Sequence, residues 1–257
     1  MGRIHLFEFE DLNWFPVFIR NYMTDFLQFL SNKGRLYKPI VPIIKETLKK
    51  SNTETIIDLC SGGGGGLIEL NRELKKEIPE IKFIMTDYYP NIAAFEHTKT
   101  LADNFKYESI SVDARKVPSE LKGLRTQFLS FHHFKPSDAK LILQNSIDSK
   151  SSIAIFEGQE RSIPSILAMI FSPIIVLLTT PFITPFKLGR IIFTYLIPIV
   201  PLFVFWDGIV SSLRTYSVEE MEELIKQLEG KEKYNWEVGK MKSGLSKLLY
   251  LIGTEKK

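Results

Sequence analysis

The feature that most constrains this chain is an apolar run that ends near an acid and then turns through glycine. Residues 55–61 read TIIDLCS and precede five consecutive glycines at positions 62–66. Leucines at 67, 70 and 74 follow at helical spacing. The order predicts a buried strand, a glycine turn and a helix. Such a turn brings backbone N–H groups and a helix N-terminus up to a ligand, so it typically binds part of a nucleotide.

Two common glycine loops do not fit this stretch. A P-loop needs Gly-Lys-Ser/Thr at its end, whereas Leu67-Ile68-Glu69 follows Gly66. A dinucleotide loop needs Gly-x-Gly-x-x-Gly/Ala, and the sixth position is leucine or isoleucine here. Asp58 would also face a pyrophosphate of its own sign. The carboxylate instead favours a ligand with hydrogen-bond donors, such as a ribose or an amino acid.

Further strands are expected after the turn, and acids stand at several of their ends. We expect strands at 81–87, ending in Asp87; at 107–114, ending in Asp113; at 126–131, running into His132 and His133; and at 152–156, ending at Glu157. The ends of parallel strands gather at one edge of a sheet, which is where ligands bind. A carboxylate at that edge can accept hydrogen bonds from both hydroxyls of a ribose.

The pattern acid-x-x-x-Gly-x-Gly, with two further strand-end acids, resembles the first motifs of class I S-adenosylmethionine (SAM) methyltransferases. The resemblance covers residues 52–157 and about 214–255, although the family more often has glycine where Cys60 stands. It implies an α/β fold with a Rossmann-like seven-stranded, mostly parallel sheet and an antiparallel last strand. It also implies SAM as the cofactor, held by Asp58, Cys60, Ser61, Gly62, Gly64, Asp87, Tyr88, Asp113, Ala114 and Ser130.

Four regions are expected. They are an N-terminal helical cap at 1–51, with helices at 14–30 and 40–49; a SAM-binding core at 52–161; an apolar, proline-rich insert at 162–208; and a C-terminal helix and hairpin at 209–257 that complete the core. Ser217 and Glu220 have the spacing of a capping box, which marks the start of that last helix. The hairpin strands are expected at 234–238 and 248–253.

The insert departs from an ordinary soluble enzyme. Residues 162–186 and 191–206 form uncharged runs of 25 and 16 residues, and six of the chain's 13 prolines lie within them. The first run exceeds the roughly 20 residues of a membrane span, but so many prolines argue against a straight one. We expect a shallow hairpin in one leaflet, with Lys187 and Arg190 at the headgroups. A buried lid or a homodimer interface is the alternative.

Composition narrows the possible partners and the compartment. Cys60 is the one cysteine in the chain, so no internal disulfide forms and a reducing, cytoplasmic location is expected. The net charge is +3 and the lysines are scattered, which does not favour a nucleic-acid partner. Together with the insert, this predicts a cytoplasmic protein that is peripheral or monotopic on the membrane face.

Catalytic candidates follow the fourth and fifth strands. His132 or His133 could take a proton from a methyl acceptor, since imidazole titrates near neutrality, and Glu157 could orient one of them. Alternatively, one histidine caps the next helix and the other packs in the core. Asp11, Tyr37, Arg214 and Tyr216 are further candidates that no spacing supports. No metal site is expected, because adjacent histidines on an extended backbone point apart.

The sequence therefore predicts SAM-dependent methyl transfer to a hydrophobic or membrane-associated small molecule or lipid. Three alternatives stay open. The acceptor could be a small soluble molecule, with the insert as lid or dimer interface. The chain could bind SAM as a scaffold without turnover. A nucleotide-dependent oxidoreductase would bind NAD, but no intact dinucleotide loop supports it.

Overall fold

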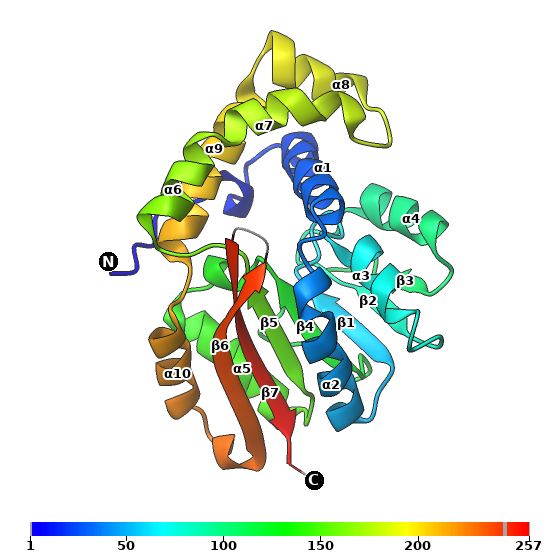
Figure 1. The fold of residues 1–257 in the computed structure, drawn as a ribbon, viewed down its shortest axis with the longest axis vertical. Helices are drawn as coiled ribbons and strands as arrows, with labels where there is room; N and C mark the ends of the chain where they lie inside the picture. The colour runs from blue at the N-terminus through cyan, green and yellow to red at the C-terminus, as the bar shows by residue number, and fades with distance from the viewer. Residues whose placement is uncertain (1, 244–245, 257) are drawn as a thin grey trace.

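The computed structural model describes residues 2–243 and 246–256, which contain a seven-stranded sheet of order β3-β2-β1-β4-β5-β7-β6 (Figure 1). The strands are β1 (Thr55–Leu59), β2 (Lys82–Met85), β3 (Phe105–Tyr107), β4 (Leu124–Phe128), β5 (Ile153–Glu157), β6 (Tyr234–Ser243) and β7 (Ser246–Glu255). β1 to β5 are parallel, and β7 runs antiparallel to both β5 and β6. The predicted α/β sheet with an antiparallel last strand is confirmed.

Helices cover both faces of the sheet. They are α2 (Val41–Ser51), α3 (Leu67–Leu74) and α4 (Ile92–Leu101) on one face, with α5 (Pro136–Asp148) and α10 (Val218–Lys226) on the other. Successive strand residues point to opposite faces, so Ile56 packs in the first core and Ile57 in the second. The predicted capping box of α10 is present, with Ser217 and Glu220 each accepting the other's backbone N–H.

Several strand boundaries differ from the predictions. The hairpin strands expected at 234–238 and 248–253 extend over 234–243 and 246–255, and the strand expected at 81–87 covers 82–85. The strand expected at 107–114 is β3 at 105–107, because its partner β2 ends at Met85, which pairs with Tyr107. Residues beyond Tyr107 have no strand to pair with and form a loop. The strand expected at 126–131 ends at Phe128, because Leu129 adopts a positive φ of 53° that breaks the strand.

The cap and the insert form one helical unit above the carboxyl ends of the strands (Figure 1). Its helices are α1 (Val17–Lys33), α6 (Ile163–Ile170), α7 (Ser172–Thr179), α8 (Leu188–Ile191) and α9 (Ile199–Arg214). Short helical turns complete the chain: η1 (Phe9–Asp11), η2 (Lys38–Ile40), η3 (Phe131–His133), η4 (Thr180–Phe182), η5 (Ile192–Leu196) and η6 (Lys231–Lys233). Ile19 and Phe26 of α1 share a buried apolar cluster with Val176 and Val200 of the insert.

The two cations of the insert do not reach outward, which corrects the expectation that they lie at lipid headgroups. Arg190 is 1% exposed and its Nη1 donates to Asp25 Oδ2 of α1 at 2.6 Å. Lys187 Nζ donates to the same oxygen at 2.7 Å. Arg190 Nη2 also donates to the carbonyls of Ile183 and Pro185. The two cations therefore hold the insert against α1 and do not lie at lipid headgroups.

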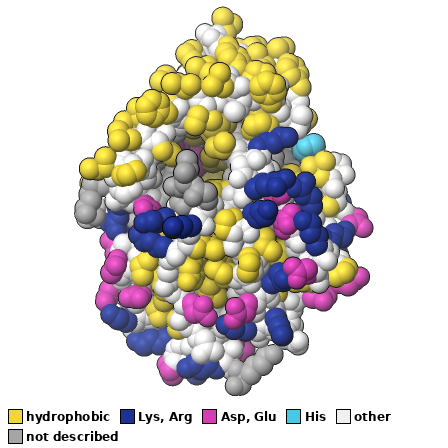
Figure 2. Space-filling model, in the orientation of Figure 1, with side chains coloured by type: hydrophobic (Ala, Val, Ile, Leu, Met, Phe, Trp, Pro, Cys, Tyr) yellow, Lys and Arg dark blue, Asp and Glu magenta, His cyan; other side chains and the backbone are white. Residues whose placement is uncertain are grey.

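The outer side of the helical unit is strongly apolar (Figure 2). Exposed large apolar side chains gather there: Trp14, Val17, Phe18, Ile163, Leu167, Phe171, Ile174, Leu178, Phe182, Phe186, Leu188, Leu196 and Leu202. We call these residues the apolar tip. Within the described ranges, no one helix has the length and hydropathy of a bilayer span, but 163–170 with 172–182 and 188–196 with 199–214 meet that test as pairs bent by 42° and 79°.

Candidate functional site

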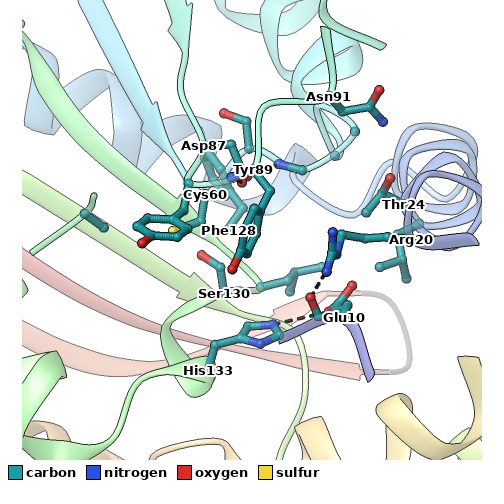
Figure 3. A pocket seen from close by; sticks show the side chains of 18 of the residues that line it. Glu10, Arg20, Thr24, Cys60, Asp87, Tyr89, Asn91, Phe128, Ser130 and His133 are labelled. Carbon is teal, nitrogen blue, oxygen red and sulfur yellow. Dashed lines mark hydrogen bonds and ion pairs between the residues drawn. The ribbon is translucent and has the colours of Figure 1, made fainter. Parts of the chain in front are cut away.

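A cavity of about 350 Å³ lies between the carboxyl edge of the sheet and the helical unit (Figure 3). Its walls are the turn after β1, the loops after β2, β3 and β4, helix α1 and turn η1. This is the edge at which the sequence predicted a ligand. One end of the cavity is formed by the glycine turn, and the other by acids of η1 together with His133.

The glycine turn is shaped by close packing against the cap. Gly62 and Gly64 have positive φ values of 54° and 89°, which side chains disfavour. A Cβ at Gly63 would lie 3.0 Å from the carbonyl oxygen of Thr24, and one at Gly66 would lie 2.7 Å from the Tyr37 ring. The run of glycines therefore lets the turn pack closely between α1 and the sheet, and its backbone lines the cavity.

Asp58 holds this turn from behind. Its Oδ2 accepts from Ser61 Oγ at 2.7 Å and its Oδ1 from Thr126 Oγ1 at 2.8 Å. The side chain is buried and does not line the cavity, and burial raises its pKa to about 7. Asp58 thus fixes the shape of the turn, and the structure gives it no direct access to a ligand.

Asp87 joins the ends of β1 and β2 at the cavity wall. Its Oδ2 accepts from the backbone N–H of Gly62 at 2.7 Å, and its Oδ1 from that of Tyr89 at 2.8 Å. Each carboxylate oxygen has a second lone pair, so the group can still accept from a ligand in the cavity. Burial raises the pKa of Asp87, and the two backbone donors oppose that rise.

Asp113 reaches the cavity from the loop after β3, although it does not end a strand. Arg115 Nη2 donates to its Oδ2 at 2.7 Å and Arg115 Nη1 donates to Asp138 at 3.1 Å. The Arg115 hydrogen bond lowers the pKa of Asp113. Of the predicted cofactor residues, Cys60, Ser61, Gly62, Asp87, Tyr88, Asp113, Ala114 and Ser130 line the cavity, whereas Asp58 and Gly64 lie behind it.

His133 stands at the acidic end of the cavity (Figure 3). Its Nδ1 is 2.8 Å from Asp11 Oδ1 and its Nε2 is 3.4 Å from Glu10 Oε1. Burial lowers the pKa of His133, but the charges of Glu8, Asp11 and Glu10 outweigh it and raise the pKa well above the ordinary value. A protonated His133 donates hydrogen bonds and is not a base at neutral pH.

His132 and Glu157 lie deeper. His132 Nδ1 is 2.8 Å from Glu157 Oε2, and its backbone N–H donates to Glu157 Oε1 at 3.0 Å. Burial lowers the pKa of His132, so the ring is neutral at pH 7 and its Nδ1–H faces Glu157. The predicted orienting role of Glu157 has the geometry it needs, while neither residue lines the cavity. Their roles in catalysis stay predictions.

The two histidines do not point apart, which corrects the reason given for expecting no metal. They share turn η3, and their ring centroids lie 4.4 Å apart with planes tilted by 31°. Adjacent side chains of a 3-10 turn are about 120° apart around its axis, which is less than the separation to opposite faces of an extended strand. Both rings therefore meet the acids of η1.

Sequence reasoning missed four residues of this region. Glu8 and Glu10 come from η1 and its cap, Arg20 of α1 donates from Nε to the carbonyl of Glu10, and Asp207 of α9 accepts from the N–H groups of Phe9 and Glu10. The signals were three acids in four residues at 8–11, and Asp207 as the one acid between 162 and 213. Of the weaker candidates, Asp11 and Tyr37 line the cavity, whereas Arg214 and Tyr216 do not.

The sheet order, with the glycine turn after β1, gives a fold that solved SAM-dependent methyltransferases share. Three solved structures share it: PigF with S-adenosylhomocysteine, with a TM-score of 0.53 and 17% identity over 96% of this chain; human N-acetylserotonin methyltransferase in complex with SAM, 0.50 and 11% over 90%; and a SAM-dependent methyltransferase from Aquifex aeolicus, 0.51 and 15% over 90%.

The lengths of these proteins differ from that of this chain. It spans 63% of PigF and 56% of the human enzyme, which is less than two thirds of either, but 97% of the Aquifex aeolicus protein. No protein-family model and no curated protein matches the sequence. At these identities the likeness shows the fold.

Proposed function

We propose that this chain is a SAM-dependent methyltransferase whose acceptor is a hydrophobic or membrane-associated small molecule or lipid. The observation that carries the proposal is the cavity itself. The glycine turn, Asp87 and Asp113 line it, and in Figure 3 Cys60 and Asp87 lie across it from His133 and Glu10. One end thus suits a cofactor and the other suits an acceptor whose proton must be handled.

The residues at the cofactor end fit SAM. The glycine turn offers backbone that side chains would obstruct, as the close approach of Gly63 to Thr24 shows. Asp87 retains lone pairs for ribose hydroxyls, and Asp113 can accept from an adenine amino group. When bound, SAM supplies a methyl group on a sulfonium, and transfer requires mainly that the acceptor be held in line.

The acceptor end offers two kinds of group. His133, protonated and held by Asp11, can donate a hydrogen bond that orients an acceptor oxygen or nitrogen. His132 is neutral, is oriented by Glu157, and has no hydrogen-bond partner on Nε2 among the described residues. That free lone pair can take either a proton or a cation. The His132 ring lies beside that of His133 but does not line the cavity, so it acts from behind the acceptor end.

The apolar tip supports a membrane-associated acceptor. Phe182, Phe186 and Leu196 are exposed by 70%, 68% and 77%, and they belong to the helical unit that lies over the carboxyl ends of the strands (Figure 1). Apolar patches of this extent on a soluble surface mark contact with a membrane or another protein. A bilayer in contact with the apolar tip would place hydrophobic acceptors next to the helical unit, which forms one wall of the cavity. We therefore also propose a cytoplasmic protein bound to the membrane face.

The enzymatic proposal is tested with labelled SAM and a total lipid extract. We expect SAM to bind in calorimetry and a labelled lipid-soluble product to form, which mass spectrometry identifies. Binding of SAM without any labelled product in lipid or aqueous metabolite extracts would favour the scaffold alternative. A labelled water-soluble product would favour a soluble acceptor. Absence of SAM binding would remove the proposal.

The membrane proposal predicts that charges on the apolar tip prevent vesicle binding. The triple variant Phe182→Glu, Phe186→Glu and Leu196→Glu should lose at least tenfold in partition onto phosphatidylcholine vesicles, because burial of each large apolar side chain contributes about 1.5–3 kcal/mol. Co-sedimentation with vesicles measures it. Deleting the insert is unsuitable, because Ile19 and Phe26 of α1 pack against it.

The matched control for this test is the triple variant Leu101→Glu, Ile110→Glu and Leu141→Glu. These three residues lie outside the helical unit and are exposed by 51%, 66% and 51%. It should bind vesicles like the unmodified chain. Equal binding by both triple variants would contradict the membrane proposal. A dimer that only the tip variant converts to monomer, in light scattering without lipid, would favour the dimer-interface alternative.

A further inference from the structure

Two buried side chains beside the cavity leave three polar atoms without a hydrogen-bond partner among the described residues. Glu8 is 0% exposed; its Oε1 lies 3.1 Å from Arg214 Nη1 and its Oε2 lies 3.3 Å from His133 Nδ1, but neither contact has hydrogen-bond geometry. His132 Nε2 is in the same situation. Buried polar atoms without partners are rare, and each one lowers the stability of the fold unless a bound group contacts it. The three orphan atoms lie together, next to His133, so one occupant can satisfy all of them.

The distances suit a metal ion. His133 Nδ1 is 3.3 Å from Glu8 Oε2, and His132 Nε2 is 4.0 Å from Glu8 Oε1. One ligand atom from each of the three residues lies within 4.8 Å of the others. Nitrogen and oxygen ligands sit about 2.0–2.2 Å from zinc, so two of them are at most about 4.4 Å apart. A small side-chain rotation closes the set.

The surroundings of His132 are those of a metal-binding histidine. Its Nδ1 is held by Glu157 Oε2 at 2.8 Å, which leaves Nε2 as the free lone pair aimed at Glu8. Metal-ligating histidines almost always have such a carboxylate or carbonyl on the other ring nitrogen, because it fixes the tautomer and the ring orientation. Glu157 would therefore act as a positioning residue for the ion.

The local charge also favours a cation. The acids packed around the three side chains are Glu8, Glu10, Asp11, Glu157 and Asp207, and the permanent cations are Arg3, Arg20 and Arg214. Arg214 Nη1 lies 3.1 Å from Glu8 Oε1, so it competes for that oxygen and leaves Oε2 to a metal. Five acids thus face three arginines, so the surroundings of the cluster are richer in acids than in permanent cations.

We propose that Glu8, His132 and His133 bind one divalent transition-metal ion. Two imidazoles and one carboxylate suit zinc, iron or cobalt rather than magnesium or calcium, which prefer all-oxygen sites. His133 also lines the cavity, so an ion that replaces the Nδ1 proton now shared with Asp11 lies at the acceptor end. This role rests on the proposed methyl transfer. The ion would lower the pKa of an acceptor hydroxyl so that its proton leaves to water, and the oxygen would then form a bond to the methyl carbon as the bond from that carbon to the SAM sulfur breaks.

The test uses the full-length chain, stripped with EDTA, dialysed and titrated with Co²⁺. We expect one equivalent to bind with the visible absorption of a four- or five-coordinate site, and Zn²⁺ to displace it. Glu8→Gln and His132→Gln should each weaken binding at least tenfold. Glu157→Gln should weaken it about 10- to 100-fold, as outer hydrogen-bond partners of metal ligands do. His97→Gln, a histidine of α4 outside the cluster, is the control and should bind like the unmodified chain.

Several outcomes would overturn the site: no Co²⁺ or Zn²⁺ binding at micromolar concentration, binding that Glu8→Gln leaves unchanged, or an equal loss in His97→Gln. Glu8→Gln is nearly isosteric, and circular dichroism with His133→Asn as a second variant guards against a folding defect. Metal binding is read without turnover. Failure of the methyltransferase proposal would show as absent SAM binding or product, with Co²⁺ binding intact.

Discussion

Replacing Asp25 by alanine should lower the free energy of unfolding by about 3–5 kcal/mol, which is the cost of leaving a buried charge without its partner. Asp25 accepts from both Arg190 and Lys187. Lys187 is 27% exposed and can turn to water, but the side chain of Arg190 is 2% exposed and cannot. The guanidinium would stay buried next to an alanine, held only by the carbonyls of Ile183 and Pro185.

Urea unfolding followed by tryptophan fluorescence measures this effect, since Trp14 and Trp206 report on the helical unit and Trp236 on the sheet. The control is Glu223→Ala, which breaks an exposed pair with Lys226 and should cost about 0.2–1 kcal/mol or less. A loss below 1 kcal/mol for Asp25→Ala would contradict the buried pairing. An early transition confined to the helical unit would show that only the insert detaches.

This pairing illustrates what the sequence could not supply. Arg190 and Asp25 are 165 positions apart, and nothing in either local pattern indicates the other. An uncharged run with two cations is typical of membrane segments, so the cations were expected at headgroups. Only the packing of α1 against the insert shows that one acid satisfies both. The local sequence pattern shows that the insert is apolar, but it does not show which segment the insert packs against.

The core was more predictable because its signals are local. The glycine turn after Asp58 and the capping box at Ser217 each depend on residues close in sequence, and both are present. β3 was misplaced because the length of an edge strand is set by its neighbour: β2 ends at Met85, whatever the residues after Tyr107 prefer. Leu129 likewise ends β4 through a positive φ that no sequence pattern signalled.

The residues of the site also divide into those with a local sequence signal and those that only tertiary packing brings together. Asp87 and Asp113 were predicted because loops after parallel strands meet at one edge, which holds even where the strand boundary was wrong. Glu8, Glu10 and Asp207 belong to the cap and the insert, and they reach the histidines only through tertiary packing. The cofactor end is thus readable from the sequence of the core, whereas the acceptor end is assembled from segments with no motif.

Asp87→Ala should weaken SAM binding at least tenfold, or about 1.4 kcal/mol or more, because it removes charge-assisted hydrogen bonds to the ribose. The carboxylate also receives the N–H groups of Gly62 and Tyr89, so its loss loosens the turn that lines the cavity. Both effects act in the same direction. Isothermal titration calorimetry with SAM gives the ratio of dissociation constants.

A matched control separates this from a general loss of charge. Asp103→Ala removes a carboxylate whose side chain is 88% exposed and pairs with Lys75 outside the cavity, so SAM affinity should not change.

The pH dependence of SAM binding gives a second readout. Burial raises the pKa of Asp87, so its carboxylate forms only as pH rises through that value, and SAM affinity should rise with it. This rise should be absent in Asp87→Ala, and unchanged affinity in that variant would contradict the ribose assignment.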